Sequence, residues 1–62
     1  MNKEVFLQFV DQRVTIVFEN HFRLSGFIRR VYDDSFIFET EQKTGAISCA
    51  RIHEIYPVRG SP

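Results

Sequence analysis

Residues Val14–Gly26 read VTIVFENHFRLSG, and this stretch sets the fold class of the chain. In its first half, Ile16 and Phe18 continue the apolar row begun at Val14 with a period of two, which is typical of a strand that buries one face. Val17 falls between them and is predicted to point outward. A strand is therefore predicted over residues 13–19.

A tight turn at Asn20 and His21 leads into a second strand, predicted over residues 22–32. Asparagine tolerates the positive φ that hairpin turns require, although histidine replaces the more usual glycine. Gly26 interrupts this strand, and a glycine within a strand commonly marks a sharp bend or a bulge. The inward positions of the strand are Phe22, Leu24 and Ile28, and the outward positions are Arg23, Ser25, Phe27 and Arg29.

The rest of the chain supplies one helix and three shorter strands. Asn2 can cap a helix over residues 2–11. The apolar face of this helix consists of Val5, Phe6, Phe9 and Val10. Further strands are predicted over residues 35–41, 46–50 and 52–57, the last ended by proline, which cannot donate to a ladder. Residues 1–59 then form one mostly-β domain with a tail at 60–62. Short strands with tight turns predict a small, strongly bent barrel of the SH3-like type.

The small size of the chain favours assembly. A domain of 62 residues has a core that supplies no more than about 3–5 kcal/mol of net stability, so such domains add disulfides, a metal or partner subunits. Cys49 is the one cysteine, which excludes an internal disulfide. Cys49, His21 and His53 lack the spacing of a zinc site, so the sequence predicts no metal site and no cofactor. Oligomerisation is the stabiliser that remains.

The charge balance and hydropathy limit the classes of function. Eight basic and eight acidic side chains cancel, which argues against indiscriminate nucleic-acid binding but leaves room for a local basic face. No apolar run reaches the ~20 residues that a membrane span needs, and the N-terminus lacks the pattern of a signal peptide. A cytoplasmic protein without a membrane partner is therefore expected. Seven phenylalanines exceed what a small core holds, which indicates a surface for partners.

Several residues of the opening stretch carry a family resemblance. Asn20, Phe22, Arg23, Leu24 and Gly26 match, without a gap, the first motif of the Sm-like family, and within it they resemble bacterial Hfq most. Residues 52–57 are similar to the Ala-Ile-Ser-x-hydrophobic-hydrophobic-Pro ending of the last strand in that family. The similarity spans nearly the whole chain.

The resemblance implies a fold, an assembly and an activity. The family fold is an N-terminal helix on five strongly bent antiparallel strands, and subunits form a homo-oligomeric ring, most often a hexamer, through the fourth and fifth strands. The implied interface candidates are Ala46, Ser48, Ala50, Ile55 and Tyr56. An Hfq-like ring binds small RNA or mRNA as a post-transcriptional regulator. The implied RNA-binding candidates are Val17, Asn20, Phe22, Arg23, Ser25, Phe27, Arg29 and Arg30.

The chain departs from the family at positions that grip bases. The family carries Tyr-Lys-His where this sequence has Ser48-Cys49-Ala50, and an aromatic residue at the position of Ser35. The alternative function is therefore an Sm-like ring with degenerate RNA sites that acts as a protein-binding scaffold. No catalytic constellation is present, because His53 beside Glu54 is typical of an ordinary surface, and no enzyme is expected.

The outward row of the second strand has two interpretations. Arg23, Arg29 and Arg30 could clasp phosphates while Phe27 stacks a base. In the other interpretation, the strand is solvated and its arginines pair with Glu19 or Glu39 on neighbouring strands.

Overall fold

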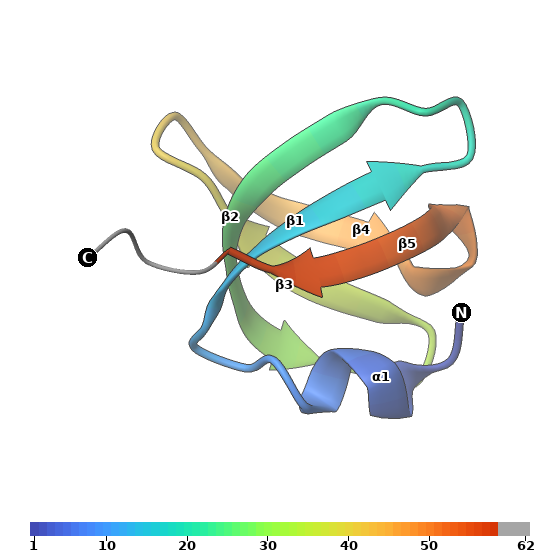
Figure 1. The fold of residues 1–62 in the computed structure, drawn as a ribbon. Helices are drawn as coiled ribbons and strands as arrows, with labels where there is room; N and C mark the ends of the chain where they lie inside the picture. The colour runs from blue at the N-terminus through green and yellow to red at the C-terminus, as the bar shows by residue number, and fades with distance from the viewer. Residues whose placement is uncertain (59–62) are drawn as a thin grey trace.

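The computed structural model describes residues 1–58 and is mostly β, with a short N-terminal helix and a five-stranded antiparallel sheet (Figure 1). The elements are α1 (Lys3–Leu7), β1 (Arg13–Phe18), β2 (Arg23–Val31), β3 (Ser35–Glu39), β4 (Thr44–Ser48), the 3₁₀ turn η1 (Cys49–Arg51) and β5 (Ile52–Pro57). The predicted mostly-β class is confirmed. The predicted tail at 60–62 lies outside the described residues.

The sheet has the order β4-β3-β2-β1-β5, so β4 and β5 form its two edges. Each neighbouring pair is antiparallel. The sheet bends strongly, and the long strand β2 curves through most of its height (Figure 1). Within residues 1–58, β4 and β5 do not pair with each other, so the sheet is open and the predicted small barrel stays a prediction.

Gly26 makes the bend of β2 possible. A Cβ atom at this position would collide with the carbonyl oxygen of Glu39 and lie 3.0 Å from the ring of Phe38. The backbone of β3 therefore crosses β2 at a distance that only glycine allows. The sequence predicted a sharp bend or a bulge at this glycine, and the structure shows the bend together with this close approach.

The core lies in the hollow of the bent sheet, and α1 covers part of it. Phe6 is fully buried and stacks on Phe36, with ring centroids 4.4 Å apart. Phe36 in turn meets Phe38 edge to face at 6.1 Å. Other fully buried side chains are those of Val14, Ile16 and Ile28. A helix this short is not stable alone, so the packing of Phe6 on Phe36 stabilises α1 on the sheet.

Two polar contacts support the position of α1. The Asn2 side chain accepts a hydrogen bond from the Glu4 backbone amide at 3.1 Å, as predicted for a cap. The Lys3 ammonium donates to Asp33 in the turn after β2 at 2.9 Å. That hydrogen bond and the opposite charges raise the pKa of Lys3 and lower the pKa of Asp33. Both side chains are exposed, so the pair orients the helix more than it stabilises the fold.

The predicted helix over residues 2–11 is too long, because α1 ends at Leu7. Val10 forms a parallel bridge with Ile28, and the backbone amide of Asp11 donates to the Ile28 carbonyl at 2.7 Å. Asp11 also has a φ of 63°, which no helical residue adopts. The helical spacing of Phe9 and Val10 reflects packing on the core after the helix has ended.

The fourth predicted strand is displaced by two residues. The turn closes between Thr40 and Lys43, where the Thr40 backbone amide donates to the Lys43 carbonyl at 2.8 Å, so β4 already begins at Thr44. Ala50 consequently lies in η1 and not in a strand. The third strand likewise stops at Glu39 rather than at residue 41. The second strand begins at Arg23, one residue later than predicted.

Candidate functional site

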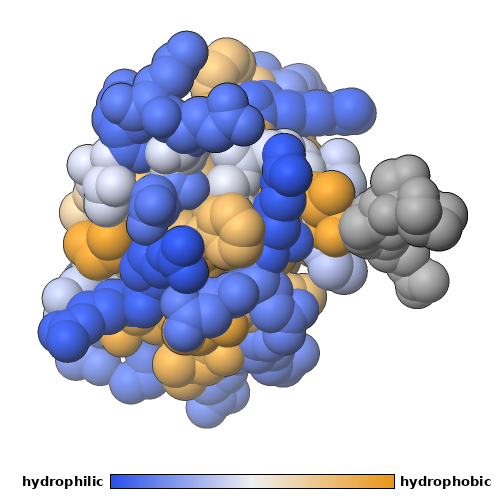
Figure 2. All heavy atoms as spheres, turned by 90° about the vertical axis from the view of Figure 1, so that its left-hand side faces the viewer, coloured by the Kyte–Doolittle hydropathy of each residue, from blue (hydrophilic) through white to orange (hydrophobic). Residues whose placement is uncertain are grey.

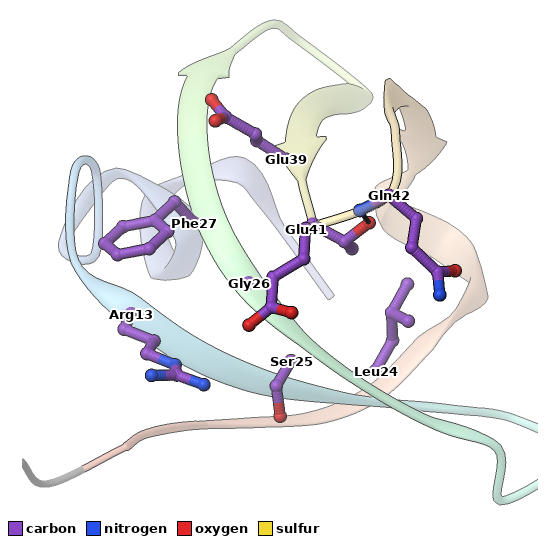
Figure 3. Close-up of a pocket in the computed structure, with 9 residues that line it drawn as sticks. Arg13, Leu24, Ser25, Gly26, Phe27, Glu39, Glu41 and Gln42 are labelled. Carbon is purple, nitrogen blue, oxygen red and sulfur yellow. Dashed lines mark hydrogen bonds between the residues drawn. The ribbon is translucent and has the colours of Figure 1, made fainter.

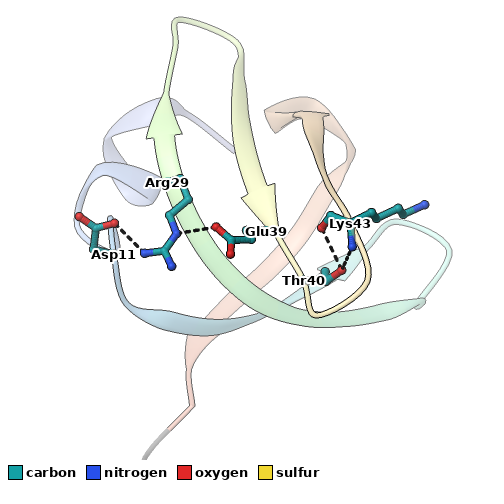
Figure 4. A network of polar contacts seen from close by, with 5 residues as sticks. All are labelled: Asp11, Arg29, Glu39, Thr40 and Lys43. Atoms are coloured by element: carbon teal, nitrogen blue, oxygen red, sulfur yellow. Dashed lines mark hydrogen bonds and ion pairs between the residues drawn. The ribbon is translucent and has the colours of Figure 1, made fainter.

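Arg29, the most prominent candidate of the outward row, is held in an ion-pair network (Figure 4). Its guanidinium donates to Asp11 and to Glu39, each at 2.9 Å, and lies 4.6 Å from the centre of the Phe27 ring. The hydrogen bonds to Glu39 and Asp11 raise the pKa of Arg29. Two carboxylates thus balance its charge, and the half-buried Phe27 ring is covered on one face by the guanidinium. A phosphate would have to displace these partners.

Strand β2 contains a bulge at Arg29. Ile28 faces Phe38 and Arg30 faces Ile37, so Arg29 is the extra residue of β2. A bulge redirects side chains on either side of it. Arg23 lies at the other end of β2, directly opposite Val17 on β1. Arg30 is exposed beyond the bulge. The register from Arg23 to Phe27 is regular, and Arg29 lies over the Phe27 ring, so these residues stay neighbours, while the bulge separates Arg30 from them.

Val17 lies outside the core cluster that contains Val14, Ile16 and Phe18, in keeping with its predicted outward position, but only 6% of it is exposed. Arg23 on β2 and Glu54 on β5 lie directly opposite Val17 and share its face of the sheet. Long charged side chains cover apolar neighbours with their aliphatic stems. The same face buries Thr15, whose hydroxyl hydrogen-bonds the hydroxyl of Ser25 at 2.8 Å. Val17 and Ser25 are therefore occupied by contacts within the sheet.

Phe22 was predicted to point into the core, and this was wrong, because 58% of it is exposed. It precedes β2 and closes the hairpin, where its carbonyl accepts from the Phe18 amide at 2.8 Å. The Asn20 carboxamide oxygen accepts from the Phe22 amide at 3.0 Å and fixes the turn. The Phe22 ring leans on Phe18, with centroids 6.0 Å apart. Its remaining surface faces solvent.

Phe22 borders a cleft of about 370 Å³ that lies between the β1–β2 turn and edge strand β4. We refer to it as the Phe22 cleft. Its apolar lining includes Phe38 and Ile47. The polar and basic residues of its lining are Asn20, Thr40, Lys43 and Arg51, and within residues 1–58 no carboxylate contributes to it. An exposed aromatic ring with two cations and no acidic neighbour suits a ligand with flat rings and negative charge.

Local contacts fix the backbone of Lys43 and the side chain of Arg51 beside the cleft. The Lys43 amide donates to the Thr40 hydroxyl at 3.2 Å, and that hydroxyl donates to the Lys43 carbonyl at 3.1 Å (Figure 4). Arg51 ends η1, and its guanidinium lies 5.4 Å from the centre of the Phe18 ring. Neither residue belonged to the candidates from the sequence. They come from two separate turns, and no local pattern connects them with Phe22.

A second hollow, of about 420 Å³, lies at the bend of β2 (Figure 3). Phe27 and Gly26 form part of it, but among residues 1–58 its lining has Glu39 and Glu41 against one cation, Arg13. Its acidic excess disfavours phosphate. The side of the molecule at which β2 bends is mostly hydrophilic, with small separate hydrophobic patches (Figure 2). The Phe22 cleft is therefore the better candidate for an anionic ligand.

The interface candidates lie along or beside both edges of the sheet. Ala46 and Ser48 are exposed on β4, and Ala50 is exposed in η1. On β5, Ile55 is half-buried against the core, whereas Tyr56 is 39% exposed and lies opposite Thr15. Among them only Tyr56 offers a large exposed apolar surface.

The structure also brings together two histidines that the sequence separates. The rings of His21 and His53 meet edge to face, with centroids 6.3 Å apart. Cys49 is buried elsewhere in the core, and burial raises the pKa of its thiol. Within residues 1–58, no group of three or more His, Cys, Asp or Glu side chains is placed to hold a metal ion. No helix in the same range is long and apolar enough to cross a membrane.

Comparison with protein families, with curated proteins and with solved structures found no match to this chain. The similarity to the Sm-like family therefore remains an interpretation of the sequence motifs.

Proposed function

We propose that the chain is an Sm-like subunit that assembles into a homo-oligomeric ring, a hexamer as in most of the family. The ring binds single-stranded RNA and acts as a post-transcriptional regulator of Hfq type. The proposal extends the family resemblance with one observation of the structure. That observation is the exposed Phe22 ring beside Lys43 and Arg51, in a cleft to which residues 1–58 contribute no carboxylate.

Each group of the Phe22 cleft has a role in such binding. The exposed Phe22 ring stacks a base, an interaction of about 1–3 kcal/mol that tolerates any sequence. Lys43 and Arg51 neutralise the flanking phosphates. The Asn20 carboxamide oxygen is held by the Phe22 amide, so its amino group is the part that can donate to a base edge. The contact is shallow, and repetition around a ring would strengthen it.

The open sheet supports the ring. Its edge strands β4 and β5 present unpaired backbone groups, and an exposed edge is a template for the strand of another chain. Pairing of β4 in one subunit with β5 in the next would satisfy both edges at once. It would also bury the exposed surface of Tyr56 and add stability that a core of this size lacks.

RNA binding is tested by titrating short poly-U, poly-A and mixed-sequence RNA at physiological salt and following fluorescence anisotropy. Phe22→Ala is expected to weaken binding by at least roughly 5- to 150-fold, which corresponds to the loss of one stacking interaction, and by more for an RNA that spans several subunits. Lys43→Gln is expected to weaken binding of every sequence and to flatten its salt dependence, because one phosphate contact is lost.

The matched control for this test is Arg30→Gln, which removes the same charge from an exposed position outside the cleft. Its affinity is expected to stay within about twofold of the original. If Arg30→Gln weakens binding and Phe22→Ala does not, RNA binds along β2 and the cleft is not the site.

The ring is tested by light scattering of the protein in solution. The expected mass is several times that of one chain. Tyr56→Glu places a charge on edge strand β5 and is expected to release monomers. Tyr32→Glu is the control, since Tyr32 is also exposed, at 47%, but lies outside the edge strands. A monomeric unmodified protein would contradict the ring.

A protein-binding ring is the second candidate function. It is favoured by the zero net charge, the carboxylates that neutralise Arg29, and the apolar lining of the Phe22 cleft, which includes Phe38 and Ile47. An intact ring that binds none of the three RNAs would favour this candidate over RNA binding.

A further inference from the structure

His21 and His53 are brought together by two unusual backbone conformations. His21 has a φ of 69°, a region that is uncommon outside glycine and in which histidine is found more often than most other residues. On β5, Glu54 faces Val17 and Ile52 faces Phe18, so His53 is the extra residue of a bulge. A bulge re-aims the side chain that it carries. Both deviations direct an imidazole toward the same point on the surface.

Backbone hydrogen bonds hold this arrangement. The His21 amide donates to the Phe18 carbonyl at 2.8 Å and closes the turn. The Glu19 amide donates to the Arg51 carbonyl at 3.0 Å and joins that turn to the start of β5. The relative position of the two imidazoles is therefore set before any ligand arrives, which lowers the entropy cost of binding.

The ring nitrogens of both histidines are available. Among residues 1–58, neither imidazole takes part in a hydrogen bond or an ion pair with the protein. Both side chains are exposed. Two imidazoles on one tetrahedral ion, each nitrogen about 2.0–2.1 Å from it, have ring centres roughly 5 Å apart. The observed 6.3 Å is close enough for rotation about the side-chain bonds to bring both nitrogens onto one ion.

We propose that His21 and His53 form a two-imidazole site for one divalent transition-metal ion of the zinc, nickel and copper group. Imidazole suits these ions, whereas Mg²⁺ and Ca²⁺ prefer oxygen ligands. Water occupies the other coordination positions, since no third side chain of residues 1–58 joins the pair. The site uses none of the residues that line the Phe22 cleft, and the proposal does not depend on RNA binding.

Titration calorimetry with Zn²⁺ and with Ni²⁺, added to the purified full chain, tests the site. One ion per chain is expected. His21→Asn and His53→Asn are each expected to weaken binding at least tenfold, and the double variant to be little weaker than either single variant, because the two rings hold the same ion. Zn²⁺ should also raise the Tm of the original protein and leave that of both variants unchanged.

His21→Asn carries its own control for folding. Asparagine adopts the positive φ of this turn more readily than histidine, so the variant should fold at least as well as the original. A loss of Zn²⁺ binding in this variant is then a loss of a ligand and not of structure. Affinities within twofold of the original for both single variants, or two independent ions per chain, would overturn the proposal.

Discussion

Replacing Gly26 by alanine is expected to remove most of the stability of the subunit. The added Cβ would collide with the backbone carbonyl of Glu39, which cannot rotate away as the end of a side chain could. Overpacking typically costs about 1–3 kcal/mol, and a clash with backbone lies at or above the top of that range. A domain of this size holds about 3–5 kcal/mol in total. If the variant folds, its Tm should fall by roughly 10–25 °C.

Gly45→Ala is the matched control for this prediction. Gly45 lies on edge strand β4, directly opposite Phe38, and a Cβ built there meets no other atom within 4 Å. The same methyl group is therefore expected to leave Tm within a few degrees of the original. Thermal unfolding followed by circular dichroism measures both variants. Equal and small effects at the two glycines would show that β3 does not approach β2 as closely as the structure has it.

The contrast between the two glycines shows what the sequence could predict about the fold. The period of two in β1, the hairpin turn and the mid-strand Gly26 predicted the mostly-β class and the place of the bend, because each is a property of a few neighbouring residues. The length of the helix was not predictable in this way. Phe9 and Val10 keep a helical spacing, but the Asp11 amide is satisfied by Ile28, a partner distant in the sequence.

The candidate site was less predictable than the fold, because its residues depend on contacts between strands. Alternation placed Val17 outside, but Arg23 and Glu54 cover it from two neighbouring strands. Arg29 was a candidate for binding phosphate, but in the structure it pairs with Glu39 on β3 and with Asp11 after α1. These carboxylates lie 10 and 18 positions away in the sequence. Pairing register and the bulge at Arg29 decide these contacts, and neither is encoded in a local pattern.

Phe22 illustrates the same limit at the end of a strand. Its apolar side chain and its position just before Arg23 predicted burial, yet the turn held by Asn20 leaves it exposed. The cations beside it, Lys43 and Arg51, come from the β3–β4 turn and from η1. The sequence therefore identified Phe22 as a candidate, whereas Lys43 and Arg51 were found only from the structure.

Phe36→Ala is expected to cost about 3–5 kcal/mol, as truncation of a buried phenylalanine usually does. Phe36 is fully buried, stacks on Phe6 at 4.4 Å and meets Phe38 at 6.1 Å. The substitution therefore opens a cavity where helix and sheet are joined. Phe22→Ala removes an equal volume from a ring that is 58% exposed and should cost less than about 1 kcal/mol. Urea unfolding at one protein concentration compares the two variants.

The dependence of Phe36→Ala on protein concentration also separates the stability of the subunit from that of the ring. The expected loss equals most of what a core of this size provides, so a free subunit of the variant should be largely unfolded. Assembly favours the folded state by mass action. The variant is therefore expected to be folded at high protein concentration and to unfold on dilution, with the urea midpoint falling as it is diluted. A midpoint that is independent of concentration would show that the subunit is stable alone. A loss below about 1 kcal/mol would contradict the stacking of α1 on the sheet through Phe36.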